Sequence, residues 1–184
     1  MEIIPILNEE GDIIGKEERK VAHEQELLHP GIRVLVKLSN NKFVFQRRSL
    51  TKETNPGKMT FAATGHVKCG QSFEEAAIEE LREETGIRAD IKDLVYLGDH
   101  KDKLEGGTIG KKQHRVWGYF YGYTYQGDIS ELQIEENEID GFEAYSIEEL
   151  KRMNQEERNK FVELIFVPQI VAMLEKYENQ NQET

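Results

Sequence analysis

The chain has 184 residues, a formal net charge of −11 and one cysteine, Cys69. This length fits one domain that needs no disulfide bonds, and the lone cysteine suits a reducing cytoplasm, where we expect the protein. The acidic charge argues against polymeric nucleic acid as a partner but permits small phosphorylated ligands beside a bound cation. We find no signal peptide and no apolar run near the roughly 20 residues of a membrane helix, so no membrane contact is expected.

Short apolar runs separated by turn residues occupy the first third of the chain, and this pattern indicates β-hairpins. Residues 3–7 and 13–14 flank a glycine turn and predict an N-terminal hairpin. The charged residues 16–28 are expected to be helical or irregular. Further strands are predicted at 32–38, 42–46 and 59–63, the first two joined by a Ser-Asn-Asn turn.

Residues 73–85 are the clearest predicted helix, because good helix formers stand there between a start signal and a stop signal. Ser72 and Glu75 have the spacing of a capping box. Gly86 supplies the left-handed residue that commonly ends a helix.

Acidic side chains lie on the side of this helix that also carries its apolar residues. Glu80 and Glu84 share that side with Phe73 and two alanines, and Glu83 lies at its edge. Two buried carboxylates one turn apart repel each other and need either protons or a cation. Because Mg²⁺ and Mn²⁺ favour carboxylate oxygens, one interpretation is a divalent-cation site. The alternative is a solvated helix that happens to be rich in glutamate.

The second half of the chain mixes strands and helices. We expect strands at 91–97, 115–124 and 141–145, a loop or long hairpin tip at 100–112, a helix at 147–153, and a helical stretch at 158–177 that is kinked or split at Pro168. Residues 179–184 are expected to be a frayed tail. This order favours an α/β fold with a mixed sheet, in one domain over residues 1–178 with an N-terminal hairpin extension at 1–28.

The loop before the predicted helix completes a motif. Residues 65–71 carry glycines and lead directly into the helix, where the backbone can approach a ligand closely. Together with the helix they resemble the Nudix box, with Gly65 as its first glycine and residues 80–87, Glu-Leu-Arg-Glu-Glu-Thr-Gly-Ile, as its complete tail. The resemblance implies the Nudix α/β/α sandwich with a mixed β-sheet. It also implies that Glu80, Glu83 and Glu84 are metal ligands and catalytic residues.

Two positions of the box differ from the family pattern. Gln71 stands where the family has Glu, and Glu79 stands where it has Arg. In family members that Arg typically makes an ion pair that orients the catalytic glutamates, a role that Glu79 cannot take. A further negative charge beside Glu80 would raise nearby carboxylate pKa values. Lys68 or Arg82 is a candidate substitute.

Outside the box the chain resembles isopentenyl-diphosphate isomerase and its Nudix relatives. This looser resemblance covers most of the chain, from the N-terminal hairpin to the Phe-Val-Pro at 166–168. It implies that Arg47, Arg48 and Lys52 face a diphosphate, and that Gly65 and His66 belong to the same substrate-binding site. Two solvated arginines at a strand end are the alternative for Arg47 and Arg48.

The chain lacks the residues that would make it an isomerase. Thr64 stands where the isomerase has the cysteine that transfers protons, and a threonine hydroxyl does not do this work near neutral pH without strong activation. The stretch comparable to its Glu-any-Glu pair is Gln-His-Arg at 113–115. Isomerase activity is therefore not expected. His23, His29 and His66 match metal positions of the isomerase, but a joint metal site stays open because its two acidic partners are missing.

The sequence thus predicts a MutT-like hydrolase that uses Mg²⁺ or Mn²⁺ to cleave a diphosphate linkage in a nucleoside diphosphate derivative. In many Nudix hydrolases a late acidic loop joins the site; here Glu138 is the expected catalytic acid, Glu136 the second choice, and an acidic loop without a role the alternative. An isomerase-like enzyme and a catalytically weak diphosphate-binding protein are the other candidates. The exact small-molecule substrate and the oligomeric state, a homodimer included, stay open.

Overall fold

A computed structural model describes residues 2–52, 54–105 and 113–180, although the side chains at 103–105, 113 and 114 fall outside the description. Within these ranges no helix is long and apolar enough to cross a membrane. The tip of the predicted hairpin at 106–112 and residues 181–184 of the predicted tail lie outside the described residues.

The strands and helices follow a mixed order along the chain. The strands are β1 (Ile3–Leu7), β2 (Ile13–Glu18), β3 (His29–Leu38), β4 (Phe43–Arg48), β5 (Met59–Phe61), β6 (Ala63–His66), β7 (Val95–Glu105), β8 (Gln113–Tyr125) and β9 (Ile139–Tyr145). The helices are α1 (Arg19–Glu24), α2 (Phe73–Thr85), α3 (Ile147–Arg152), α4 (Gln155–Arg158) and α5 (Pro168–Gln180), with 3-10 turns η1 (Ile91–Asp93), η2 (Ile129–Glu131) and η3 (Glu163–Phe166).

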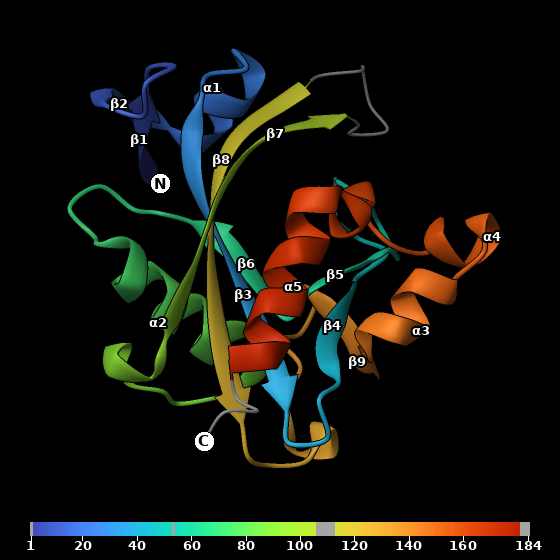
Figure 1. Cartoon of the computed structure of the whole chain (residues 1–184). Helices are drawn as coiled ribbons and strands as arrows, with labels where there is room; N and C mark the ends of the chain where they lie inside the picture. Colours follow the sequence, from blue (N-terminus) through green and yellow to red (C-terminus); the bar gives the residue numbers. More distant parts are fainter. Residues whose placement is uncertain (1, 53, 106–112, 181–184) are drawn as a thin grey trace.

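A mixed sheet lies between helices, as expected for the α/β/α sandwich. Its order is β5-β4-β3-β8-β7, with β6 paired to β3 and β9 paired to β4, and β1 and β2 form a separate hairpin. The central pair, β3 and β8, is parallel, and the other pairs are antiparallel. In Figure 1, α2 lies on one side of the sheet and α5 on the other.

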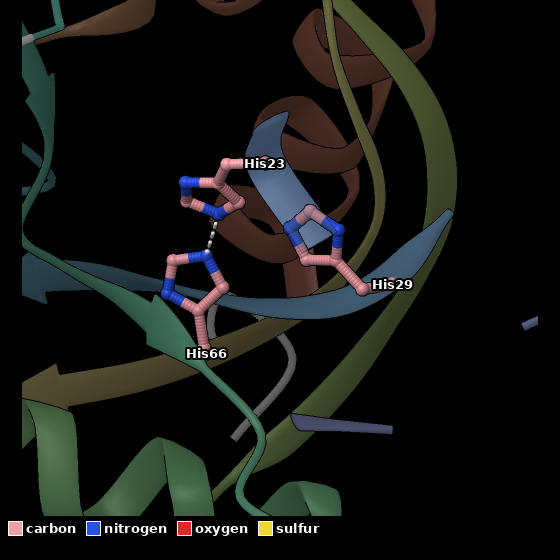
Figure 2. Close-up of side chains that lie close together, drawn as sticks. All are labelled: His23, His29 and His66. Carbon is pink, nitrogen blue, oxygen red and sulfur yellow. Dashed lines mark hydrogen bonds between the residues drawn. The ribbon is translucent and has the colours of Figure 1, made fainter. Parts of the chain in front are cut away.

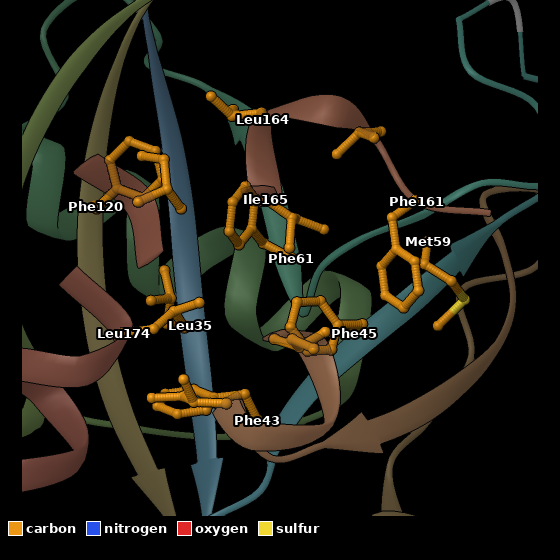
Figure 3. Packing of buried hydrophobic residues seen from close by; sticks show 14 of the residues in the cluster. Leu35, Phe43, Phe45, Met59, Phe61, Phe120, Phe161, Leu164, Ile165 and Leu174 are labelled. Atoms are coloured by element: carbon orange, nitrogen blue, oxygen red, sulfur yellow. The ribbon is translucent and has the colours of Figure 1, made fainter. Parts of the chain in front are cut away.

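Each face of the sheet has its own apolar core, because successive strand residues point to opposite faces. Alternate residues of β3, such as Ile32 and Val34, pack with Ala77 and Leu81 of α2. The core on the other face combines Leu35 with aromatic residues of neighbouring strands, such as Phe45 and Phe120, and with residues from the C-terminal third of the chain (Figure 3). A side chain on β3 therefore faces α2 or α5 according to its position in the alternation.

Helix α2 forms as its local signals predict. Ser72 accepts from the Glu75 backbone N–H, the Glu75 side chain accepts from the Ser72 N–H, and Gly86 has φ 75°. Other predictions need correction. Residues 16–18, which were expected to be helical or irregular, are part of strand β2. Residues 91–93 form η1, so the strand begins at Val95 and is longer than expected.

The predicted helical stretch at 158–177 is wrong in its first half. Helix α5 begins at Pro168, whose fixed φ and missing N–H suit a first helical turn. Before it, residues 160–162 pair with the sheet edge, since the N–H of Met59 donates to Lys160 O (2.8 Å) and the N–H of Val162 donates to Met59 O (2.9 Å). These tertiary bonds hold the segment extended.

Candidate functional site

A cavity of about 740 Å³ gathers the candidate residues of the Nudix-like box and those of distant segments. Its lining includes Glu80, Glu83 and Glu84 from α2, Arg48 from the end of β4, Lys52 from the turn after it, and Thr64, Gly65 and His66 from β6. Glu135 and Glu138 come from the late acidic loop. The structure thus brings together all predicted site residues except Arg47.

The carboxylates of α2 meet the backbone of β6 at very short range. A Cβ at Gly65 would overlap the Glu80 carboxylate, so any larger residue there would displace that carboxylate. Burial, followed by the charges of Glu84 and Glu83, raises the pKa of Glu80 to about 9. Neutralisation by protons or by a divalent cation relieves this repulsion, and oxygen-only donors of this kind suit Mg²⁺ or Mn²⁺.

Glu84 is the most firmly held of the three glutamates. Its Oε2 accepts from the Gln46 side-chain amide and from the Thr64 backbone N–H, both at 2.7 Å. Burial raises its pKa to about 7 despite these two bonds, which act in the opposite direction. Sequence reasoning missed Gln46, an amide that directly follows three apolar residues of β4 and has 1% of its surface exposed in the folded chain.

The two departures from the box compensate each other. The Gln71 side-chain amide donates to Glu79 at 2.7 Å, and Lys68 Nζ donates to the same oxygen at 2.8 Å. These bonds lower the pKa of Glu79, with the Lys68 bond as the largest cause. A donor at position 71 and an acceptor at position 79 therefore keep a hydrogen bond between the loop and the helix. Of Lys68 and Arg82, the two candidates to substitute for the family Arg, it is Lys68 that contacts Glu79.

Cationic side chains reach the cavity from β4 and the turn after it. Arg48 Nε donates to Thr54 O (2.9 Å), and burial lowers its pKa. Lys52 pairs with Glu138. Arg47, one position before Arg48, points to the opposite face and pairs with the exposed Glu143 instead. The expectation that Arg47 faces the substrate is not supported by this geometry.

The late loop contributes two acids. Glu138 lines the cavity as expected, held by its backbone carbonyl, which accepts from the Ser49 N–H at 2.9 Å. Glu136 is exposed and is not among the lining residues. Glu135, which sequence reasoning did not select, does line the cavity, and burial followed by the charge of Glu138 raises its pKa.

Three histidines from separate elements meet in the fold (Figure 2), and two of them, His23 and His66, line the same cavity as the glutamates. One candidate ligand atom from each of His23, His29 and His66 lies within 4.8 Å of the others, and His23 Nε2 and His66 Nε2 are 3.0 Å apart. The Leu27 carbonyl can only accept, so His29 Nδ1 carries the hydrogen at 2.8 Å and Nε2 is its potential metal-binding atom. These imidazoles form a set that could hold a transition-metal ion.

Residues outside the recognised motifs complete the cavity wall. Glu2 and Arg19, which form an ion pair at 3.1 Å, line it from the N-terminal segment. Arg33 lines it from β3. Of the stretch compared with the isomerase carboxylate pair, only the Arg115 side chain is described, and it pairs with Glu9. No single sequence segment signals this assembly, because its members meet only in the folded chain.

A family model described as the NUDIX domain matches residues 27–165. The chain belongs to the Nudix family. An uncharacterized Nudix hydrolase of Clostridium acetobutylicum is 32% identical over 154 residues, covering 82% of this chain and 73% of that protein. The DR0079 protein of Deinococcus radiodurans has a similar fold, with a TM-score of 0.65 at 22% identity, over 81% of this chain and 86% of that one.

Nudix hydrolases typically cleave pyrophosphate bonds in nucleoside diphosphate derivatives, and metal binding is typical of the family. The chain is also 33% identical to the isopentenyl-diphosphate Delta-isomerase of Aliivibrio fischeri over 121 residues, covering 62% of this chain and 67% of that protein. The resemblance to both branches is therefore confirmed. In this Nudix protein, however, Cys69 is exposed and does not line the glutamate cavity, where Thr64 stands.

Proposed function

We propose that this Nudix protein is a Mg²⁺- or Mn²⁺-dependent diphosphohydrolase acting on a nucleoside diphosphate linked to a further group. The observation that carries the proposal is the meeting of Glu80, Glu83 and Glu84 with Arg48 and Lys52 in one cavity. Burial makes the carboxyl groups of Glu80 and Glu84 difficult to ionise, which suits them to a cation, and the two cationic side chains are suited to phosphate oxygens.

The residues divide the work by their chemistry. Glu80, Glu83 and Glu84 would hold Mg²⁺ or Mn²⁺, which supplies neutralisation of the diphosphate and activation of the attacking water. Glu138 would accept a proton from that water. Arg48 and Lys52 would neutralise the outer phosphate oxygens, while the missing side chain of Gly65 and the ring of His66 shape the wall against which the substrate lies.

The proposal predicts a steep loss of turnover on removal of one carboxylate. Glu84→Gln should lower kcat about 100-fold or more, because it removes a cation ligand. The assay is metal-dependent hydrolysis of nucleotide sugars, dinucleotides and nucleoside triphosphates. Glu156→Gln, an exposed change on α4, serves as the matched control. Unchanged turnover in Glu84→Gln would contradict the assigned roles.

The isomerase-like alternative has one observation in its favour, the relative from Aliivibrio fischeri. Thr64 offers a hydroxyl where a thiol is needed, and its backbone N–H is already bonded to Glu84. Incorporation of deuterium from solvent into isopentenyl diphosphate would favour this alternative. A protein inert towards every diphosphate tested, yet thermally stabilised by one of them, would instead be a binding protein.

A further inference from the structure

Arg33 is a buried cation in strand β3, and the function proposed above gives it no role. Every residue of β3 is buried, and the Arg33 side chain is 8% exposed. It pairs with Asp102 of β7, whose side chain is 1% exposed, across the intervening strand β8. A buried ion pair costs desolvation, and apolar residues of similar volume often stabilise a fold as well or better. Its position at the cavity indicates a role beyond packing.

The sheet leaves room for this guanidinium. Gly31 and Gly118 are register partners on β3 and β8. A Cβ at Gly118 would overlap Nη1 of Arg33, and a Cβ at Gly31 would lie 3.6 Å from the same atom. The guanidinium carbon also lies 5.4 Å from the centre of the Phe120 ring. The guanidinium thus occupies space beside Gly118 that a side chain at that position would fill, and it lies near the Phe120 ring.

The guanidinium faces the same cavity as the glutamates from the other side of the sheet. Alternation along β3 puts Arg33 on the α5 face, with Leu35, while Ile32 and Val34 face α2. Arg33 is the register partner of Thr64, whose backbone N–H bonds Glu84. Arg33 and Glu84 therefore lie on opposite faces of the sheet, and both line the cavity. Among the described residues, Asp102 is the hydrogen-bond partner of Arg33, through Nη2.

We propose that Arg33 is a substrate-binding residue that donates hydrogen bonds to phosphate oxygens in the cavity, and that Asp102 is the positioning residue that orients it. A guanidinium has five N–H donors, and Asp102 engages one nitrogen, so donors remain for a tetrahedral anion. This inference rests on the proposed function, because it takes the glutamate cavity as the diphosphate site.

The test measures the binding of inorganic pyrophosphate by calorimetry with Mg²⁺ present, so that no turnover is needed. Arg33→Met should weaken binding about 10- to 100-fold, the loss expected for hydrogen bonds to a charged group. Because Arg33→Met leaves Asp102 buried without its partner, Arg33→Met/Asp102→Asn is made as well. Arg115→Met, the same change at an Arg that pairs with Glu9 away from the cavity, is the control and should stay within about twofold of the wild type.

Two further measurements separate binding from structure. In hydrolysis assays, Arg33→Met/Asp102→Asn should raise KM more than it lowers kcat, and Arg33→Lys should recover part of the affinity because it keeps the charge. A folded double variant that binds pyrophosphate like the wild type would overturn the proposal, as would a wild type that does not bind it. If the wild type hydrolyses no substrate but the Arg33 variants still bind pyrophosphate more weakly than the wild type, the inference stands and only the proposed turnover fails.

Discussion

Gln46 of β4 donates a hydrogen bond from its side-chain amide to Glu84 of α2 at 2.7 Å. The acceptor is Oε2, which also receives the Thr64 N–H, so the second carboxylate oxygen is left for other partners. A strand residue thereby fixes the rotation of a carboxylate on the helix that packs across the sheet. Such outer contacts orient metal-binding side chains in many proteins.

Loss of this contact should weaken metal binding without removing any metal-binding group. We expect Gln46→Met to lower Mn²⁺ affinity about 10-fold or more, as for other residues that orient ligands. Titration calorimetry with Mn²⁺ measures the change. Gln155→Met, at an exposed position on α4, is the control. Equal Mn²⁺ affinity in Gln46→Met and the control would show that the bond does not orient Glu84.

Metal-free stability should fall as the pH rises. Burial raises the pKa of Glu80 to about 9 and that of Glu84 to about 7, from an ordinary value of 4.5. Above pH 4.5 and up to these values, the two glutamates bind more protons in the folded chain than in the unfolded chain, so their contribution to the free energy of unfolding decreases with increasing pH. The lowered pKa of His66 acts in the opposite direction below its ordinary value of 6.5 and offsets part of this decrease. We expect the metal-free thermal midpoint to drop between about pH 5 and about pH 9.

Added Mg²⁺ or Mn²⁺ should reverse part of this loss. The cation competes with protons for the same carboxylates, so its stabilising effect should grow with pH. Thermal unfolding with and without millimolar metal measures both trends. Glu80→Gln should flatten the pH dependence because it removes the larger of the two shifts. A midpoint that rises with pH in the metal-free protein would contradict the prediction.

The pair formed by Gln71 and Glu79 should be replaceable by Glu and Arg, the residues that the family pattern has at these two positions. Gln71→Glu alone puts two carboxylates where Gln71 and Glu79 now share a 2.7 Å hydrogen bond, and should lower kcat/KM about tenfold. The double variant Gln71→Glu/Glu79→Arg recreates the family pair and should restore the activity. Steady-state hydrolysis distinguishes the variants. Equal activity in the single and double variants would show that this link does not orient the glutamates.

The histidine cluster should bind a metal ion independently of the glutamates. His29→Ala should remove one equivalent of Zn²⁺ measured by titration, since imidazole nitrogens are common ligands of this ion. Glu84→Gln should leave that equivalent in place. His100→Ala, which changes a histidine outside the cluster, is the control. Zn²⁺ stoichiometry that does not respond to His29→Ala would exclude this binding.

Local signals predicted the parts of the fold that local physics determines. The capping box at Ser72 and the stop at Gly86 fix α2, and the spacing of its glutamates follows from the helix itself. Tertiary pairing decided the rest. Residues 160–162 extend along the sheet edge instead of joining a helix, and the position of Arg47 in the strand turns it away from the cavity.

The candidate site was predicted where the Nudix-like box or the family resemblance identifies its residues. Glu80, Glu83, Glu84 and Glu138 were selected in advance, and they line one cavity. Gln46, Arg33 and Asp102 were missed because each acquires its meaning from a partner tens of residues away. What they share is burial in the folded chain, which the local sequence around Gln46 and Asp102 does not indicate.

The N-terminal segment brings Glu2, Arg19 and His23 to the cavity, and all three precede the region matched by the family model. The hairpin is not hydrogen-bonded into the main sheet, which holds the glutamates and Arg33 through other strands. Exchange of this segment would therefore change one wall of the cavity and leave the reaction chemistry in place. Chimeras that graft hairpins from other Nudix proteins onto residues 27–180 offer a direct route to altered substrate selection.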